Sequence, residues 1–207
     1  MRIIGLTGGI GVGKSTVAGM LEEHGAVVID VDGLGREVLE PGGLAVQRVA
    51  ERFGTGVVGD DGGIDRRALA AIVFADADDL RALEAISHPA IDAAIDARLA
   101  ELDDDAVVVL DMAVLVESTL GRCLPSGRGY DTVVVVEAPM DVRLERLVAR
   151  GHTLDDARAR MAAQAADDER RAMAHHIVVN DAGLDTLAER VDALWPALSA
   201  GSPPTGP

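Results

Sequence analysis

The feature that most constrains the fold of this chain is a glycine-rich stretch at residues 8–15, GGIGVGKS. It matches the spacing G-x-x-x-x-G-K-[ST] of a phosphate-binding loop. An apolar run at residues 2–6 leads into it, and a helical pattern opens at Lys14, as the motif requires. Glycines let a backbone wrap closely around a phosphate, whose charge is favoured by loop N–H groups and a helix N-terminus. The stretch therefore predicts binding of ATP or GTP rather than a simple glycine turn before a helix.

The residues of this loop have separable expected roles. Lys14 is expected to reach the β- and γ-phosphates, and the Ser15 hydroxyl to hold the Mg²⁺ that accompanies ATP. Thr16 follows on the first helical turn, where it is placed to contact the α-phosphate. The nucleotide-binding residues predicted from this stretch are Gly9, Gly11, Val12, Gly13, Lys14, Ser15 and Thr16.

Short Val/Ile-rich runs alternate with helical stretches along the chain. Strands are expected at residues 2–6, 26–30, 106–110, 132–136 and 177–179, and helices at 14–24, 140–150 and 184–198. Strands this apolar are typical of a sheet buried on both faces, and the alternation implies right-handed parallel crossovers. The predicted fold class is α/β: a three-layer P-loop NTPase or nucleoside kinase fold with a five-stranded parallel sheet.

Two segments interrupt this alternation. Residues 39–104 show helical patterns at 66–74, 80–87 and 91–102 without a convincing strand, which predicts a helical substrate-binding insert. Residues 150–175 are helical and dense in both Arg and Asp, as expected of a mobile lid. The predicted organisation is one domain over residues 1–198, with a core made of 1–38, 105–149 and 176–198 and a disordered tail over 199–207.

The charge of the chain argues against several classes of partner. Its 207 residues include 19 Lys and Arg against 35 Asp and Glu, a formal net charge of −16. Such a surface repels nucleic-acid backbones and anionic membranes. No apolar run approaches the ~18 residues of a membrane span, no signal peptide is visible, and the single cysteine, Cys123, cannot form an internal disulfide. We expect a cytoplasmic protein that is a monomer or a small homo-oligomer.

The use of the nucleotide depends on further motifs. Residues 30–33, DVDG, match the D-x-x-G spacing of a GTPase switch, but residues 180–183, NDAG, lack the lysine and aspartate of a base-reading N-K-x-D. The second signature of a transport ATPase is not visible. The pattern favours a small kinase over a nucleotide-dependent switch.

Two acidic residues near strand ends are candidates for chemistry. Asp32 lies just past the second expected strand, where ligands gather in an open parallel sheet, so its carboxylate can accept a proton from an attacking hydroxyl. It can equally cap the following helix, and Asp30 competes for the catalytic role. Asp111 has the placement of a Walker-B acid and is a candidate Mg²⁺ ligand, or an ordinary strand-end acid.

Arginines cluster late in the chain. Arg143, Arg146 and Arg150 share one face of an expected helix and lead into the predicted lid. Guanidinium groups there can neutralise phosphate charge, or they can pair with nearby aspartates on a solvated helix. In the insert, His88 and Pro89 are expected to end one helix and start the next.

The ordered set of motifs resembles dephospho-coenzyme A kinase, over residues 1 to about 198. Its marks after the phosphate-binding loop are IDVD at 29–32, REV at 36–38, PG at 41–42, HP at 88–89, LVE at 115–117, and then Arg146, Arg150, Gln164 and Asn180. The resemblance implies ATP-dependent phosphorylation of the ribose 3′-hydroxyl of dephospho-coenzyme A. It also implies a nucleoside-kinase core with a helical coenzyme A lobe and a lid.

The resemblance assigns roles by position. Lys14 contacts the β- and γ-phosphates, Asp32 is the base, Arg146 is the transition-state arginine, and Arg150 binds ATP from the lid. The implied acceptor-binding residues are Thr7, Asp32, Arg36, Pro41, His88 and Glu117. The expected Mg²⁺ ligands are Ser15, Asp32 and Asp111, and the expected substrates are ATP and dephospho-coenzyme A.

Two of the departures of this chain from the family pattern lie near predicted site residues. Residues 113–115 are Ala-Val-Leu where the family usually has Pro-Leu-Leu, and Asp167 stands where a basic residue is common. A kinase of the shikimate-kinase type is the alternative within the same class, because those enzymes also carry Asp-x-Asp after the second strand. The long helical insert and His88 fit that alternative less well.

Overall fold

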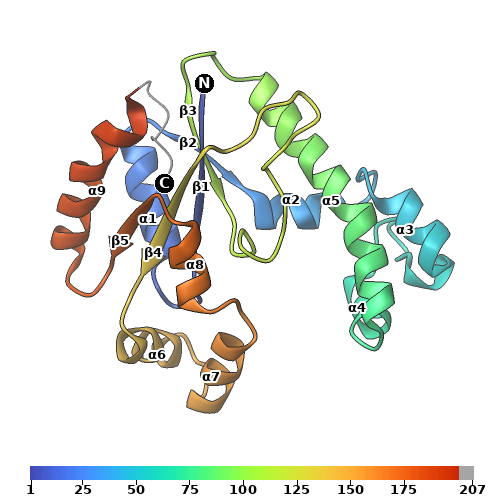
Figure 1. Ribbon diagram of the computed structural model, residues 1–207. Helices are drawn as coiled ribbons and strands as arrows, with labels where there is room; N and C mark the ends of the chain where they lie inside the picture. The colour runs from blue at the N-terminus through green and yellow to red at the C-terminus, as the bar shows by residue number, and fades with distance from the viewer. Residues whose placement is uncertain (201–207) are drawn as a thin grey trace. The chain divides into compact units, whose positions relative to one another are not determined.

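The computed structural model describes residues 1–200. They fall into two compact units (Figure 1). The first unit comprises Met1–Asp30, Leu102–Arg122 and the chain from Gly129 on, and the second comprises Val31–Glu101 and Cys123–Arg128. The second unit begins ahead of residue 39, where the sequence predicts the start of the helical insert.

The strands of the first unit form one five-stranded parallel sheet. They are β1 (Arg2–Gly8), β2 (Val27–Asp30), β3 (Val107–Asp111), β4 (Thr132–Glu137) and β5 (His176–Val179), in the order β2-β3-β1-β4-β5. The predicted α/β class and parallel sheet are confirmed, because continuous Val, Ile and Leu runs suit strands buried on both faces. The register pairs Leu6 with Asp111 and Gly8 with Val136, so the carboxyl ends of the central strands meet at one edge.

The sheet is buried on both faces. On one face lie α1 (Lys14–Glu23) and α9 (Leu184–Ser199) (Figure 1). Their shared core with the strands includes Ile4, Leu6, Val17, Leu21, Val134, Val136, Leu187 and Val191. On the other face, a Cβ added to Gly5 would lie 2.6 Å from Leu115 Cδ1, so the segment after β3 packs directly onto β1.

Three further helices of the first unit follow β4. They are α6 (Met140–Ala149), α7 (Leu154–Ala162) and α8 (Asp167–Met173). Helix α7 starts where the Thr153 hydroxyl accepts a hydrogen bond from the Asp156 N–H at 3.1 Å. The sequence predicts a disordered tail from residue 199, but Ser199 ends helix α9, and residues 201–207 of that tail lie outside the described part.

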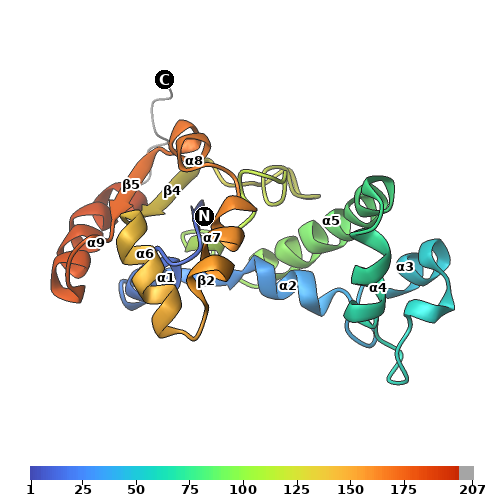
Figure 2. The same cartoon turned by 90° about the horizontal axis from the view of Figure 1, so that it is seen from below.

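The second unit is helical (Figure 2). It contains α2 (Val31–Glu37), α3 (Val46–Phe53), the short 3₁₀ helix η1 (Thr55–Val57), α4 (Arg66–Val73) and α5 (Ala77–Ala100). Asp65 caps α4 by accepting from the N–H groups of Arg67 and Ala68, and Asp76 caps α5 in the same way. Helix α3 and η1 were not among the predicted elements.

The predicted helix break at His88 and Pro89 is wrong. Helix α5 runs without interruption for 24 residues, with Pro89 inside it. Proline in a helix interior removes one hydrogen bond and costs ~3 kcal/mol. Four side chains on both sides of the proline are buried, namely Ile86, Ile91, Ile95 and Leu99. Burial of each is worth ~1.5–3 kcal/mol, which offsets the cost and keeps one continuous helix.

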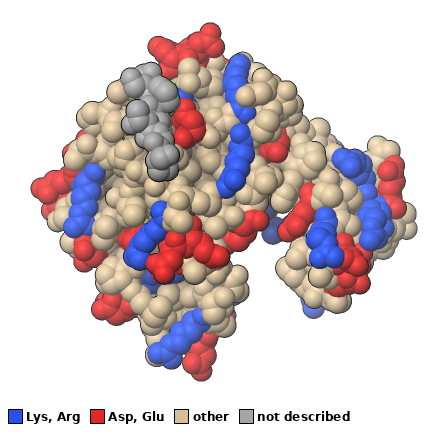
Figure 3. Space-filling model, viewed as in Figure 1, with Lys and Arg blue, Asp and Glu red and all other residues tan. Residues whose placement is uncertain are grey.

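Charged side chains are distributed over the surface. Figure 3 shows acidic and basic groups next to each other on the face in view. Exposed ion pairs such as Arg98–Glu37 at 2.9 Å and Arg160–Asp156 at 3.0 Å contribute little to stability. Across residues 1–200, the helices all fall short of the length and apolar character that crossing a membrane demands.

Candidate nucleotide-binding site

The glycine-rich loop connects β1 to α1 at the carboxyl edge of the sheet. Gly11 has φ 83° and Gly13 has φ 92°, values in the left-handed region that glycine adopts most easily. A Cβ on Gly13 would lie 2.3 Å from Asn180 Nδ2, and one on Gly8 would lie 2.7 Å from the Val136 carbonyl. The loop therefore needs glycine both for its conformation and for the close approach of its neighbours.

The backbone carbonyls of residues 10–12 are held by side chains from other elements. Arg143 Nε donates to the first at 2.9 Å, Arg146 Nη1 to the second and third at 3.4 and 3.2 Å, and Asn180 Nδ2 to the third at 2.8 Å. Across a planar trans peptide, the C=O and the next N–H point in opposite directions. When these side chains hydrogen-bond to a carbonyl, the N–H of the following residue therefore points away from them. This arrangement orients amides in the manner of an anion cradle.

On the inner side of the loop lies a hollow of about 230 Å³, the phosphate-loop hollow. Its lining residues are Gly8, Gly9, Ile10, Gly11, Gly13, Lys14, Ser15, Ala113, Arg150 and Gln164. Among these described residues, Lys14 and Arg150 are cationic and none is acidic. In a chain of net charge −16, the hollow is thus a locally positive site suited to a polyphosphate.

Lys14 forms an ion pair with Asp111, the last residue of β3. The two side chains are 17% and 15% exposed, so the pair is only partly hydrated. Ser15 is exposed at the start of α1. A carboxylate and a hydroxyl are the hard oxygen ligands that Mg²⁺ prefers, so the residues beside the loop fit this ion.

The three arginines along helix α6 and at its C-terminal end make different contacts. Arg150, at the end of the helix, lines the phosphate-loop hollow. Arg146, the predicted transition-state arginine, is not one of the described residues that line the hollow. Its guanidinium donates hydrogen bonds to loop carbonyls and to Asn180. Arg143 is buried, and burial lowers the pKa of its guanidinium, an effect that Asp167 opposes and Arg170 reinforces.

Two predicted acceptor-binding residues of the first unit make contacts within the protein. Thr7 is fully buried, and its hydroxyl donates to the Ala113 carbonyl at 3.4 Å. The side chain of Thr7 is thus enclosed at the sheet edge, and its role toward the acceptor stays a prediction. Glu117 accepts a hydrogen bond from the Ala165 N–H at 2.9 Å and so connects the segment after β3 to the α7–α8 linker.

The remaining predicted acceptor-binding residues lie in the second unit. Asp32 is half-buried in the first turn of α2, and Arg36 is exposed in its last turn. Pro41 is exposed and packs against Gly63, where an added Cβ would lie 2.8 Å from the proline Cδ. His88 is half-buried within α5.

Three residues at the site were not among the predicted site residues. Gln164 accepts a hydrogen bond from the Ile10 N–H at 2.8 Å, and Arg143 and Asn180 hold loop carbonyls. Gln164 and Asn180 stand out in the sequence only as marks of the family resemblance. Their contacts depend on segments more than 130 residues from the loop, which no local pattern reveals.

Comparison with known proteins identifies the family. Residues 2–186 match the family model described as dephospho-CoA kinase. A dephospho-CoA kinase of Streptomyces avermitilis is 48% identical over 200 residues, covering 94% of this chain and 93% of the relative. A dephospho-CoA kinase of Frankia casuarinae is 44% identical, covering 97% of this chain and 85% of the relative.

Solved structures agree on the fold. A Thermus thermophilus crystal structure has 34% identity and a TM-score of 0.80, over 97% of this chain and 98% of that one. The dephospho-CoA kinase of Campylobacter jejuni, at 23% identity and a TM-score of 0.67, covers 96% and 98% of the two chains and supports the fold alone. Shikimate kinase from Acinetobacter baumannii, at 16% identity and 0.51, also shares only the fold. The chain belongs to the dephospho-CoA kinase family of ATP-dependent phosphotransferases.

Proposed function

We propose that this chain transfers the γ-phosphoryl group of ATP to the ribose 3′-hydroxyl of dephospho-coenzyme A, which gives coenzyme A and ADP. The observation that carries the proposal is a glycine loop, held by side-chain hydrogen bonds, beside a hollow lined by Lys14 and Arg150, in a chain of this family. The bond between the acceptor oxygen and the γ-phosphorus forms while the bond from that phosphorus to the ADP oxygen breaks. The hydroxyl proton passes to a carboxylate of the protein.

Phosphoryl transfer needs positioning and charge stabilisation more than covalent chemistry. The loop amides and Lys14 are proposed to bind the β- and γ-phosphates, with Ser15 and Thr16 at the start of α1 also contributing. Lys14 exchanges its contact with Asp111 for phosphate when ATP binds. Arg150 is proposed to stabilise the transferring phosphoryl group because it lines the hollow, whereas Arg146 holds the loop.

The acceptor side of the proposal rests on the second unit. Asp32 is proposed as the base that takes the proton from the 3′-hydroxyl. A weak base suffices, because the transition state is loose and the proton leaves late. Arg36, Pro41 and His88 are proposed to bind dephospho-coenzyme A from the same helical unit.

Mg²⁺ is proposed to accompany ATP. Ser15 and Asp111 are the residues of the first unit that would hold it, with Asp32 as a further candidate. When bound, the ion neutralises charge on the β- and γ-phosphates.

Residues 150–175 are proposed to act as the lid over ATP. Gln164, in the α7–α8 linker, already bonds to the loop tip through Ile10, which supports this role. The proposal extends to a cytoplasmic enzyme that is a monomer or a small homo-oligomer. Light scattering on the purified protein tests the oligomeric state.

The test is a coupled assay of ADP release with dephospho-coenzyme A, with shikimate and with no acceptor. We expect ADP formation that depends on dephospho-coenzyme A. Asp32→Asn should lower kcat by roughly 10²–10⁴-fold while the Kd for ATP, measured without Mg²⁺, stays unchanged. Asp60→Asn is the matched control, because Asp60 is an exposed acid of the same unit. ATP turnover that ignores dephospho-coenzyme A would reject the proposal.

A further inference from the structure

We propose that Asp167 is a positioning residue for nucleotide binding, which acts through Arg143 to hold the peptide between Ile10 and Gly11. The inference rests on the proposed use of the glycine loop for ATP. It adds the first residue of helix α8 to the machinery that shapes the loop.

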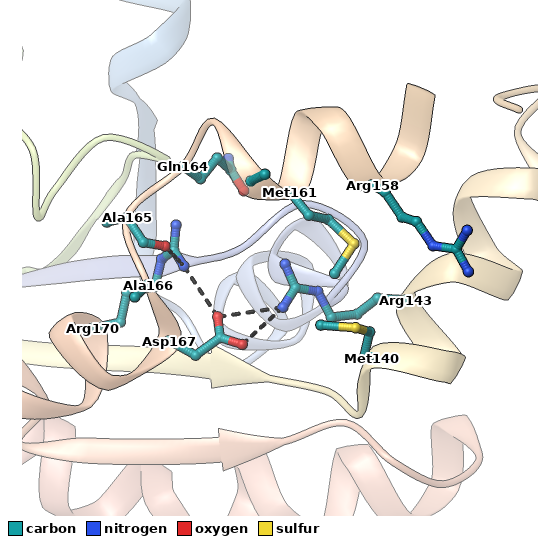
Figure 4. A pocket seen from close by; sticks show the side chains of 10 residues that line it. Met140, Arg143, Arg158, Met161, Gln164, Ala165, Ala166, Asp167 and Arg170 are labelled. Atoms are coloured by element: carbon teal, nitrogen blue, oxygen red, sulfur yellow. Dashed lines mark hydrogen bonds and ion pairs between the residues drawn. The ribbon is translucent and has the colours of Figure 1, made fainter. Parts of the chain in front are cut away.

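Hydrogen bonds form a continuous chain from Asp167 through Arg143 to the glycine-rich loop. Arg143 Nη1 donates to the two carboxylate oxygens of Asp167 at 3.0 and 3.3 Å. The Nε of the same guanidinium donates to the Ile10 carbonyl at 2.9 Å. Figure 4 shows the Asp167 carboxylate between the guanidinium groups of Arg143 and Arg170. One rigid, planar group thus connects Asp167 to the loop tip.

The held carbonyl determines where an amide points. The C=O of Ile10 and the N–H of Gly11 belong to one planar peptide and point in opposite directions. When Arg143 fixes the carbonyl, it fixes the Gly11 N–H as well. The preceding peptide is held too, because Gln164 accepts from the Ile10 N–H at 2.8 Å. Both peptides that flank Ile10 therefore depend on residues 164–167, one directly and one through Arg143.

The loop is shaped around this arginine. A Cβ on Gly9 would lie 2.4 Å from Arg143 Nη2, and one on Gly11 would lie 3.0 Å from the Arg143 carbonyl. The side chain of Arg143 is only 4% exposed. Its position is thus set by close contact with the loop backbone and not by solvent.

Asp167 pairs with two buried guanidinium groups, those of Arg143 and Arg170. Arg170 is 2% exposed and donates to Asp167 at 3.2 Å, so the carboxylate lies between two like charges. Without that carboxylate, repulsion and desolvation both favour displacement of Arg143 toward solvent. The pKa of Arg143 is lowered by burial, with Arg170 adding to the effect and Asp167 opposing it.

The experiment compares nucleotide affinity across variants at neighbouring positions. Calorimetry with ATP and with ADP, without any acceptor, gives Kd for the full-length protein. Asp167→Asn should raise Kd roughly 10-fold, in line with the loss of a half-exposed charge-assisted hydrogen bond. Asp167→Glu retains the charge and should lie closer to the unmodified protein than Asp167→Asn. In steady-state kinetics, the KM for ATP should rise while the KM for the acceptor changes less than about 2-fold.

Asp168→Asn is the matched control, because Asp168 is 92% exposed and pairs with Arg171 on the surface. It should bind nucleotide as the unmodified protein does. If Asp167→Asn lowers thermal stability but leaves Kd unchanged, Asp167 is only structural and the proposal fails. If that variant does not fold, Arg143→Lys replaces it, since lysine keeps the charge but loses the planar link to Ile10. Unchanged nucleotide affinity in Arg143→Lys then overturns the proposal. Because the calorimetry contains no acceptor, the measured Kd is independent of which acceptor the enzyme uses.

Discussion

The phosphate loop and the helical second unit differ in what carries their proposed function. In the loop, the groups proposed to bind phosphate are mainly backbone amides, and Arg143, Arg146 and Asn180 donate to the loop carbonyls from other elements. In the helical unit, the proposed groups are the side chains of Asp32 and His88, on helices whose backbones bond internally.

Because of this difference, substitutions in the loop and substitutions in the helical unit should change different measured quantities. Changes to the loop or to the side chains that hold it should weaken nucleotide binding or phosphoryl transfer, whichever acceptor is used. Changes in the helical unit should alter acceptor turnover or stability and leave nucleotide affinity intact. The predictions below test that division, in order of expected effect.

The largest effect should distinguish two arginines at the C-terminal end of helix α6, Arg146 and Arg150. Arg150→Met should lower kcat roughly 10³-fold, because Arg150 lines the hollow where charge develops. Arg146→Met should mainly raise the Kd for ATP, because Arg146 holds loop carbonyls. Steady-state kinetics and calorimetry measure the two quantities. A large loss of kcat in Arg146→Met with unchanged affinity would restore Arg146 as the transition-state arginine.

The second effect concerns the loop lysine. Lys14→Met should lower kcat roughly 10²-fold, since one charged donor to the phosphates is lost. The release of ADP in the presence of acceptor measures it. Arg48→Met is the control for loss of a positive charge, because Arg48 is exposed in the helical unit. If the control lost as much activity, the charge of the whole molecule and not the loop would be responsible.

A third prediction separates strain from contact at two glycines. Gly13→Ala should raise the Kd for ATP roughly 10-fold and lower Tm by roughly 5 °C, because its Cβ would meet Asn180 at 2.3 Å and φ is 92°. Gly25 has φ 100°, and an added Cβ there would have nothing within 4 Å. Gly25→Ala should therefore lower Tm but keep nucleotide affinity. Equal loss of affinity in both variants would mean that strain alone explains the effect.

The smallest effect is expected inside helix α5. Pro89→Ala should raise the free energy of unfolding by roughly 2 kcal/mol, because the recovered cost of the proline is partly offset by the greater freedom of the unfolded chain. Thermal denaturation measures the change, and the Kd for ATP should stay the same. A loss of stability would show that the proline itself shapes the packing of the helical unit.

The elements that the sequence predicted well are those whose local residue pattern is compatible with only one type of backbone structure. The central strands are buried on both faces, so continuous Val and Ile runs mark them. The glycine loop is equally local, since G-x-x-x-x-G-K-[ST] encodes a backbone shape. The break at Pro89 was wrong because burial along α5 outweighs the cost of the proline. The contacts of Arg146 with loop carbonyls were not predicted, because position on a helix does not show what each guanidinium meets.

The sequence by itself determined the α/β sheet, the phosphate loop and the family to which the chain belongs. Backbone conformation and strand burial follow from residue type over a few neighbours, so short patterns suffice. Only the tertiary structure decided that Arg143, Arg146 and Asn180 hold the loop carbonyls, and that Arg150 lines the hollow. Those roles depend on distances between segments more than 130 residues apart, which packing sets and spacing along the chain does not encode.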